Sequence, residues 1–498
     1  MYLVKSLEYG NVFREQKHTR VASGHGRWVD CGDTGVRRFS PNQKVVVAIV
    51  YICGMLLNSL DSTIVNVALA TLGREFGVSP ASIETVVIAY LVSLAVFIPV
   101  SGWIGDKWGT KRTFLLALMI FTIASALCGL AQTMEQLVLF RIFQGAGGGL
   151  LTPVGMAMLY RTFPPEERMG VSRILMFATI LGPALGPILG GVLIERLSWR
   201  WIFYVNVPIG IAALAFGYLF LYEHREEAAG RFDVFGFVLA GAGFGMFMYA
   251  LSEGPSKGWT APAVVAFGII GAMLLVVFVR VELKSASPMV NLHLLSNRLF
   301  RTTLSVSFFT SAGFMATLFL MPLFLQEARG VSPLQSGLAT FPEAIGVVVS
   351  TQFVARLYPR IGPRRLMASG LIGVAVVVGA MTFLHLDSSL WLVRLLMFLL
   401  GFGIAYVFLP NQAASLATIT SAQTGRASTL STVQRQLGGA LGIALVSTVL
   451  TLVGTGSDDG DVLSAYRAAF LAAALLALIG AACALKVPDR DAAITMRR

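Results

Sequence analysis

The fold of this chain is decided by residues 83–132, which read IETVVIAYLVSLAVFIPVSGWIGDKWGTKRTFLLALMIFTIASALCGLAQ. Two apolar runs, 83–104 and 114–132, flank a short basic turn that is rich in glycine. As helices rising about 1.5 Å per residue, both runs are long enough to cross a hydrocarbon core about 30 Å thick. Barrel strands would instead alternate apolar and polar residues over about ten positions. The stretch therefore predicts two membrane-spanning helices joined by a tight loop.

Comparable apolar runs recur along the whole chain. Of its 498 residues, 56% are hydrophobic and only 13% are charged, whereas soluble domains carry about 25% charged residues. We expect an all-α polytopic membrane protein with fourteen transmembrane helices. The expected spans are 45–68, 83–104, 114–132, 137–160, 170–194, 201–222, 234–251, 262–281, 302–325, 336–357, 366–386, 390–411, 427–453 and 463–486.

The basic residues indicate the orientation, because cytoplasmic loops retain Lys and Arg. If the N-terminus is inside, most of the 38 Lys and Arg residues fall in inner loops and tails. The expected outer loops hold only Arg74, Arg196, Arg200, Lys257 and Arg329. We therefore expect both termini in the cytoplasm. The net charge of +12 then reflects topology, and a nucleic-acid surface is excluded because no single basic face is formed.

An internal repeat divides the chain. The tetrapeptide GVSP at 77–80 recurs at 330–333, an offset of 253 positions, and the same offset maps Arg141 onto Arg394. Repeated halves are common in transporters, where the substrate site lies near the midplane between them. The expected parts are a cytoplasmic polar tail (1–44), an N-terminal six-helix bundle (45–222), a peripheral two-helix insertion with linker (223–297), a C-terminal six-helix bundle (298–486) and a cytoplasmic C-terminal tail (487–498).

The first 44 residues are polar and lack the long apolar stretch and cleavage pattern of a signal peptide. We expect a disordered cytoplasmic tail. An over-extended gene start is the alternative, since the helical architecture requires nothing before about residue 37.

The loop GWIGDKWGTKR at 102–112 joins the second and third expected spans on the cytoplasmic side. Glycine permits the tight reversal. Asp106 can accept hydrogen bonds from the N-terminal end of a neighbouring helix or pair with a basic side chain, which would latch two helices together. The alternative is a solvated charged turn. The candidate gate residues are Gly102, Gly105, Asp106, Gly109, Lys111 and Arg112. The repeat copy has Pro359 in place of the acid, which argues against an equivalent latch there.

Two charged residues lie inside first-half spans. Asp61, in LDSTIVNVAL, is an intramembrane acid and therefore a functional candidate, although a structural acid neutralised by a neighbour is the alternative. Its repeat counterpart is Phe314, so the fold does not require an acid there. Arg141 precedes the glycine-rich run QGAGGG and needs a partner. Both lie about 6 to 12 Å below the outer surface, so we expect an Asp61 to Arg141 contact and assign them to proton coupling.

Two further features lie within spans. The fifth expected span contains GPALGPILGG, in which glycines allow close helix contact and prolines bend the helix. Its candidate residues are Gly182, Pro183, Gly186, Pro187, Gly190 and Gly191. Glu343 is an acid in the tenth span. It is either a second protonation site, a contact for cationic substrates, or a glutamate facing water near the outer mouth.

Together these motifs resemble the fourteen-span drug:proton antiporter family of the major facilitator superfamily. WRWIFYVNVP at 199–208 and QRQLGG at 434–439 add to the resemblance, which covers about residues 40–486. It implies the major facilitator fold, a gate at Asp106, a role of Asp61 and Arg141 in proton transfer, and antiport through the span-five motif. Glu343 departs from the family pattern.

We therefore expect a proton-coupled antiporter that exports amphiphilic or cationic drug-like molecules by alternating access. The alternatives are an uptake symporter for a metabolite and a non-transporting membrane sensor. The expected partners are a small-molecule substrate, protons and the lipid bilayer, with a periplasmic adaptor protein as a further candidate and no nucleic acid. No cofactor is expected, and the scattered Cys and His residues predict neither a disulfide nor a metal site. Without Walker or HExxH motifs, the chain is not expected to be an enzyme.

Overall fold

The structure is a computed structural model of the chain. It describes residues 27–29, 38–40, 42–78, 83, 85–164, 167, 182, 185–186, 188–225, 233–285, 290–420, 423–453 and 459–496. The chain divides into two units, Met1–Asn42 and Gln43–Arg498. In the first unit, the short strands β1 (Arg27–Val29) and β2 (Arg38–Ser40) pair antiparallel. The expectation of a tail without structure is therefore wrong for these six residues.

The second unit is built of helices. Its first-half helices are α1 (Gln43–Phe76), α3 (Thr85–Trp108), α4 (Thr110–Leu130), α5 (Met134–Thr162), α7 (Trp201–Tyr204) and α8 (Asn206–Phe220). Next come α9 (Val234–Lys257), α10 (Pro262–Lys284) and η3 (Leu292–Ser296). The second half comprises α11 (Arg298–Leu323), η4 (Phe324–Ala328), α12 (Pro333–Thr340), α13 (Pro342–Ile361), α14 (Pro363–Met381), α15 (Leu390–Ser415), α16 (Thr424–Val453), α17 (Asp459–Ala484) and η6 (Ala493–Met496).

Thirteen helices of the described residues are long and apolar enough to cross a membrane. They coincide with thirteen of the fourteen expected spans, which confirms an all-α polytopic membrane protein. The remaining expected span, 170–194, falls largely on residues outside the described part of the chain.

The repeat is visible in the backbone. Gly77 and Gly330 both have φ 63°, and Gly109 and Gly362 have φ 100° and 83°. These left-handed values favour glycine, which has no Cβ atom. Because each pair is related by the offset of 253, the two halves make the same turns at equivalent positions.

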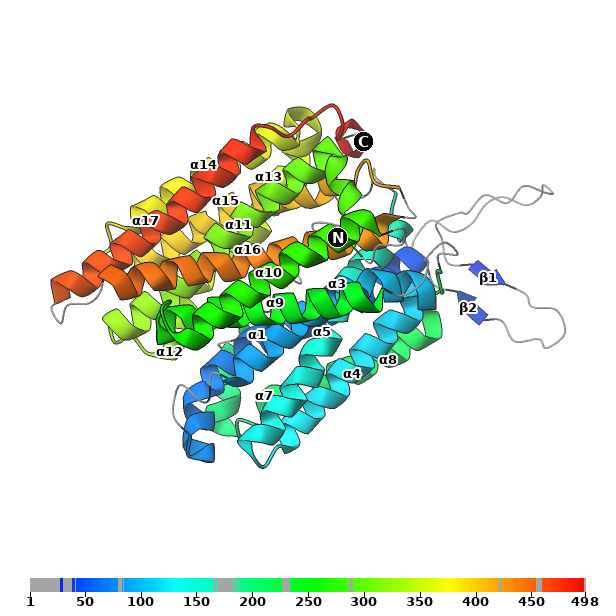
Figure 1. Cartoon of the computed structure of the whole chain (residues 1–498). Coiled ribbons are helices and arrows are strands. Elements are labelled where there is room, and N and C mark those ends of the chain that lie inside the picture. The colour runs from blue at the N-terminus through cyan, green and yellow to red at the C-terminus, as the bar shows by residue number, and fades with distance from the viewer. Residues whose placement is uncertain are drawn as a thin grey trace. The chain divides into compact units, whose positions relative to one another are not determined.

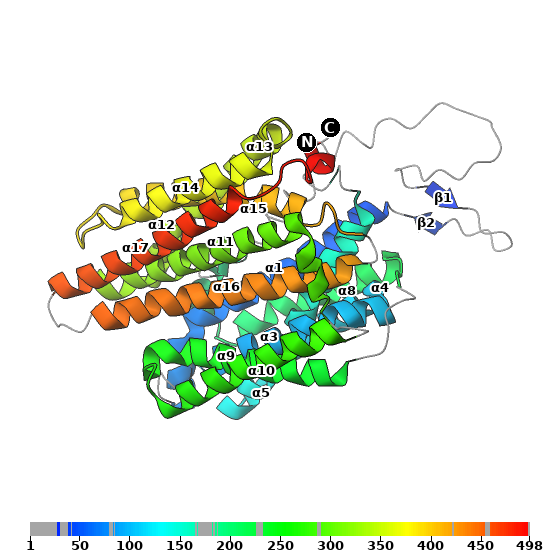
Figure 2. The same cartoon turned by 45° about the horizontal axis from the view of Figure 1, so that its top comes forward.

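One buried core lies within the second half, whereas a core of the first half also includes Phe300, Leu304 and Ala427 of the second half. In Figure 1, α1, α4 and α5 lie in one group of helices, and in Figures 1 and 2 α13, α14, α15 and α17 lie in another. Helix α16 of the second half packs against α3 and α5 of the first. Helix α9 contacts both α3 and α16, whereas α10 packs on α9 and is largely exposed. The expectation of a peripheral insertion therefore fits α10 but not α9, which borders both halves.

Candidate functional site

The Asp61 carboxylate is fully buried in α1 and forms an ion pair with Arg141 of α5. The Arg141 guanidinium donates to Asp61 Oδ2 at 2.6 Å, and both side chains are at most 1% exposed. We expected contact between Asp61 and Arg141 because both lie at a similar depth in the membrane, and the structure contains this contact. Enclosing an acid and a base together lowers the large cost of placing either charge alone in a membrane protein.

Two amide side chains complete the surroundings of this carboxylate. Asp61 Oδ1 accepts hydrogen bonds from Gln144 Nε2 at 2.8 Å and from Asn206 Nδ2 at 3.3 Å. Gln144 also accepts a hydrogen bond from Arg141 at 2.8 Å. Sequence reasoning missed both amides as site residues. Gln144 had a signal, because it lies three residues after Arg141 and so on the same face of a helix.

Aromatic packing holds the arginine in place. The Arg141 guanidinium carbon lies 4.0 Å from the centre of the Tyr90 ring, within cation–π distance. The Arg141 Nε atom donates to the Val86 carbonyl at 3.4 Å. The Tyr90 hydroxyl in turn donates to Asn58 of α1 at 2.5 Å. Helices α1, α3 and α5 therefore fix the position of Arg141 together.

Glycines of α5 make this arrangement possible. A Cβ atom on Gly145 would lie 2.5 Å from the Tyr90 carbonyl oxygen, and one on Gly149 would lie 2.6 Å from that of Leu94. Ser93 Oγ donates to the Ile142 carbonyl at 2.6 Å across the same contact. The backbones of α3 and α5 approach so closely that side chains larger than hydrogen would separate them.

We expect Gly149→Ala to destabilise the protein by about 1–3 kcal/mol, because the added methyl group meets rigid backbone. Gly373→Ala in α14 is the matched control, since a Cβ atom there has no neighbour within 4 Å. Thermal unfolding of the purified proteins in detergent measures the difference. A melting temperature of Gly149→Ala equal to that of the control would refute the close-packing requirement.

Asp106 lies at a buried contact between the two halves. Its Oδ1 atom accepts from Arg161 of α5 at 2.7 Å, with both side chains at most 5% exposed. A Cβ atom on Gly425, in the first turn of α16, would lie 2.7 Å from that same oxygen. One on Gly102 would lie 2.6 Å from Thr429 Oγ1, and Ser101 meets Thr429 at 3.2 Å. Asp106 and Gly102 thus join α3 to α16 of the other half.

The rest of the candidate gate loop has a different partner. The Glu223 carboxylate accepts from the backbone N–H groups of Lys111 at 3.0 Å and Arg112 at 3.2 Å. A Cβ atom on Gly109 would collide with this carboxylate. Glu223 therefore caps the N-terminus of α4 within the first half. Gly105 packs against Val154 of α5. Sequence reasoning identified neither Glu223 nor Arg161.

The second-half copy of this loop has an equivalent cap. Asp489, after α17, accepts from the Arg364 backbone N–H at 2.8 Å, and a Cβ atom on Gly362 would lie 3.1 Å from it. Pro359 stands where Asp106 does in the first half. The helix cap is therefore present in both halves, whereas the acid at the Asp106 position exists in the first half only.

The span-five glycines lie against the turn of α1 that carries Asp61. A Cβ atom on Gly182 would lie 2.5 Å from Ser59 Cβ, and one on Gly186 would lie 3.0 Å from Thr63 Cβ. These two positions flank Asp61. Pro183 and Pro187 lie outside the described residues. Gly190 is buried, whereas a Cβ atom on Gly191 would meet nothing within 4 Å.

Glu343 lies in the first turn of α13 and is 6% exposed. Its Oε1 atom is buried and has no hydrogen-bond partner among the described residues. A Cβ atom on Gly401 of α15 would collide with the Glu343 carbonyl, so the two helices are in close contact here. Glu343 therefore lies within the second half, apart from the Asp61 cluster on α1, α5 and α8.

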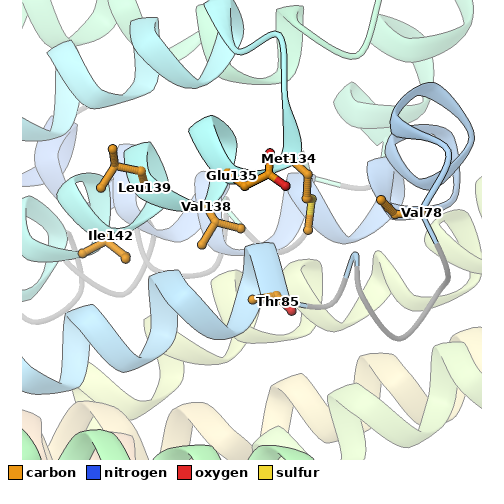
Figure 3. Close-up of a pocket in the computed structure, with 7 residues that line it drawn as sticks. All are labelled: Val78, Thr85, Met134, Glu135, Val138, Leu139 and Ile142. Atoms are coloured by element: carbon orange, nitrogen blue, oxygen red, sulfur yellow. The ribbon is translucent and has the colours of Figure 1, made fainter.

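An open, mainly apolar pocket of about 540 Å³ lies near the first turns of α3 and α5. It is lined by Val78, Thr85, Met134, Glu135, Val138, Leu139 and Ile142 (Figure 3). None of the predicted site residues lines it. Within the described ranges, no group of three or more His, Cys, Asp or Glu residues could hold a metal ion.

Comparisons with known proteins identify the family and the fold. A family model described as Major Facilitator Superfamily matches residues 51–443 and also 303–495. A multidrug resistance protein B homolog of Mycobacterium tuberculosis is 32% identical over 440 residues, covering 87% of this chain and 79% of its own length. A protein of Klebsiella pneumoniae named for multidrug resistance, MdtD, is 31% identical over 452 residues, covering 89% and 95%.

Two solved structures share the fold. The human organic anion transporter MFSD10 (TETRAN) has a TM-score of 0.62 at 16% identity, covering 89% of this chain and 99% of its own. The proton:xylose symporter XylE has a TM-score of 0.63 at 16% identity, covering 90% and 96%.

Proposed function

Because this chain belongs to the major facilitator superfamily, a family of membrane transporters rather than enzymes, we propose that it exports drug-like small molecules in exchange for protons. The observation that carries the proposal is the buried ion pair between Asp61 and Arg141 inside the spanning helices. A carboxylate held by three donors can take up a proton only if those donors withdraw, so protonation and helix movement are linked.

The coupling step follows from this geometry. A proton that enters from outside neutralises Asp61, which weakens its hold on Arg141, Gln144 and Asn206. Helix α1 is then free to move relative to α5 and α8. The glycines at 182 and 186 pack against α1 on either side of Asp61. A movement of α1 therefore also changes its contact with the span-five motif. Each elementary charge that moves inward supplies about 2.3 kcal/mol of free energy for transport per 100 mV of membrane potential.

The gate is the contact of Asp106 with Arg161 and with the N-terminal turn of α16. With both termini in the cytoplasm, this contact would close the inner face in an outward-facing or occluded state. Tyr160 reinforces the closure by donating to the Gln412 carbonyl of α15 at 2.8 Å. Breaking these contacts would open the path from the cytoplasm.

Export rather than uptake is supported by the span-five motif and by relatives named for multidrug resistance. The uptake symporter remains the second candidate, because its fold would be the same. We place the protein in the cytoplasmic or inner membrane, with a periplasmic adaptor protein as a candidate partner. Glu343 is proposed as a second protonation site rather than a cation contact, since an ionised carboxylate buried without a partner is unfavourable.

The proposal is tested in everted membrane vesicles that carry a pH gradient, with and without the protein. Addition of an exported compound should partly collapse the gradient, because each molecule moved into the vesicle lumen releases protons outward. Candidate amphiphilic drugs are screened in this way. In vesicles preloaded with the substrate, movement of substrate and protons in the same direction would support the symporter and contradict antiport.

A further inference from the structure

Tyr90 of α3 packs its aromatic ring against the cation of the buried ion pair. The centre of the ring lies 4.0 Å from the Arg141 guanidinium carbon, and Tyr90 is 1% exposed. The ring of Phe203 in α7 lies 6.0 Å from the same carbon, which is at the limit for an attraction between a cation and an aromatic face. Tyr90 is therefore the aromatic residue in closer contact with this arginine.

The hydroxyl group of Tyr90 holds the ring in this position. It donates to Asn58 Oδ1 of α1 at 2.5 Å, and Asn58 Nδ2 donates to Thr152 Oγ1 of α5 at 3.3 Å. A Cβ atom on Gly148 would lie 2.8 Å from Asn58 Oδ1 and 3.2 Å from the Tyr90 hydroxyl oxygen. The space that Gly148 leaves free is therefore occupied by this hydrogen bond, and three helices fix the ring over Arg141.

Few titratable groups surround Asp61. Arg141 is the one cation that forms an ion pair with it among the described residues. Helix α3 contributes Tyr90, and α4 contributes Cys128, whose Sγ atom lies 3.6 Å from Gln144 Oε1. The other elements around the pair present neutral side chains, such as Asn206 of α8. The protonation state of Asp61 therefore decides whether the charge of Arg141 is compensated.

The Tyr90 ring does not stabilise both protonation states equally. When Asp61 is ionised, the negative face of the ring attracts the guanidinium but repels the nearby carboxylate, so the two effects partly cancel. When Asp61 is protonated, the guanidinium keeps its charge and has no carboxylate partner. An aromatic face attracts a desolvated cation most strongly. The ring therefore stabilises the state with protonated Asp61 more than the state with the ionised pair.

We propose that Tyr90 is a positioning residue that sets the pH at which Asp61 takes up its proton. The inference rests on the proposed role of Asp61 in proton coupling and adds a determinant of the pH range in which coupling works. Without the ring, the charge of Arg141 would be poorly compensated once Asp61 is protonated. The ionised pair would then be favoured, and a more acidic solution would be needed to protonate Asp61.

The test is an infrared titration of the purified full chain in detergent, without any substrate. A protonated carboxyl group has a C=O stretching band that an ionised carboxylate lacks. The part of this band that is missing in Asp61→Asn belongs to Asp61, and its intensity against pH gives the midpoint of protonation. We expect the midpoint of Tyr90→Leu to lie about one pH unit below that of the wild type.

Tyr90→Met removes the ring as well and should give a similar shift, so either variant that folds tests the proposal. Tyr90→Phe keeps the ring and should stay within a few tenths of a pH unit of the wild type. Tyr358→Leu in α13 is the matched control. Tyr358 is also fully buried and its hydroxyl meets Thr495 at 2.7 Å, but it lies in the second half. Its replacement should leave the midpoint unchanged.

A midpoint that stays at the wild-type value or moves to higher pH in the variants without the ring would overturn the proposal. A wild-type protein in which the Asp61 band appears at no pH would overturn it too. Because the titration needs no transport, failure of the proposed function remains distinguishable. A shifted midpoint in a protein that moves no protons in vesicles would support the role of Tyr90 and contradict antiport.

Discussion

Replacing Asp61 with Asn is expected to reduce substrate-induced proton movement in vesicles at least about tenfold, to the level of vesicles without the protein. Asn keeps the size of the side chain, and its oxygen can still accept from Gln144 or Arg141. It cannot be protonated or deprotonated, so the coupling step is lost while the space is filled. Substrate binding should survive, because the change removes titration rather than the cavity.

The variant also leaves Arg141 without its counter-charge. Breaking a buried pair in this way typically destabilises a protein by about 3–5 kcal/mol. Equal amounts of wild type and variant in the membrane must therefore be established first. Asp61→Glu, which retains a titratable carboxylate, should keep part of the proton flux and shows that the loss does not come from misfolding.

Ser62→Ala is the control next to Asp61. Its hydroxyl donates only to the Ser59 carbonyl of its own helix, at 2.8 Å, and it takes no part in the carboxylate network. This variant should move protons as the wild type does. Equal proton flux from wild type and Asp61→Asn would end the assignment of Asp61, and Glu343 would become the next residue to test.

Replacing Asp106 with Asn is expected to slow transport by about 10- to 30-fold while the amount of protein in the membrane stays near normal. The change removes a charge-assisted hydrogen bond with Arg161, of a type worth about 1.5–3 kcal/mol. Because Asp106 also lies against the first turn of α16, this energy stabilises the state that is closed on the inner face. Arg161→Gln should have a similar effect, since it removes the other partner.

Glu223→Gln is the matched control for the gate. Glu223, which follows α8, is a carboxylate that contacts the same loop, but its hydrogen bonds cap α4 within the first half. Its loss should lower the thermal stability without changing the balance between inward- and outward-facing states. Transport rates in proteoliposomes, normalised to protein amount, distinguish the two cases. Undiminished turnover of Asp106→Asn would show that the loop is only a turn.

The spans and the repeat could be predicted from the sequence because both depend on one-dimensional properties. An apolar run of about 20 residues must be a helix in a membrane, since every backbone group needs an internal partner there. Because the rise per residue of a helix is constant, the sequence also predicts how deep a residue lies in the membrane. It therefore placed Asp61 and Arg141 at a similar depth. The offset of 253 positions between Gly77 and Gly330 can be read from the amino-acid sequence, and the φ of 63° that both glycines have agrees with it.

Only the tertiary structure decided which side chains complete each site. Asn206 comes from α8 and reaches Asp61 from 145 positions away, and the gate pairs Asp106 with Arg161 and with Gly425 of the other half. These helices are apolar on nearly every face, so hydrophobic periodicity does not reveal which face meets which neighbour. Close packing at glycines determines that choice, and it requires the three-dimensional arrangement of all the helices.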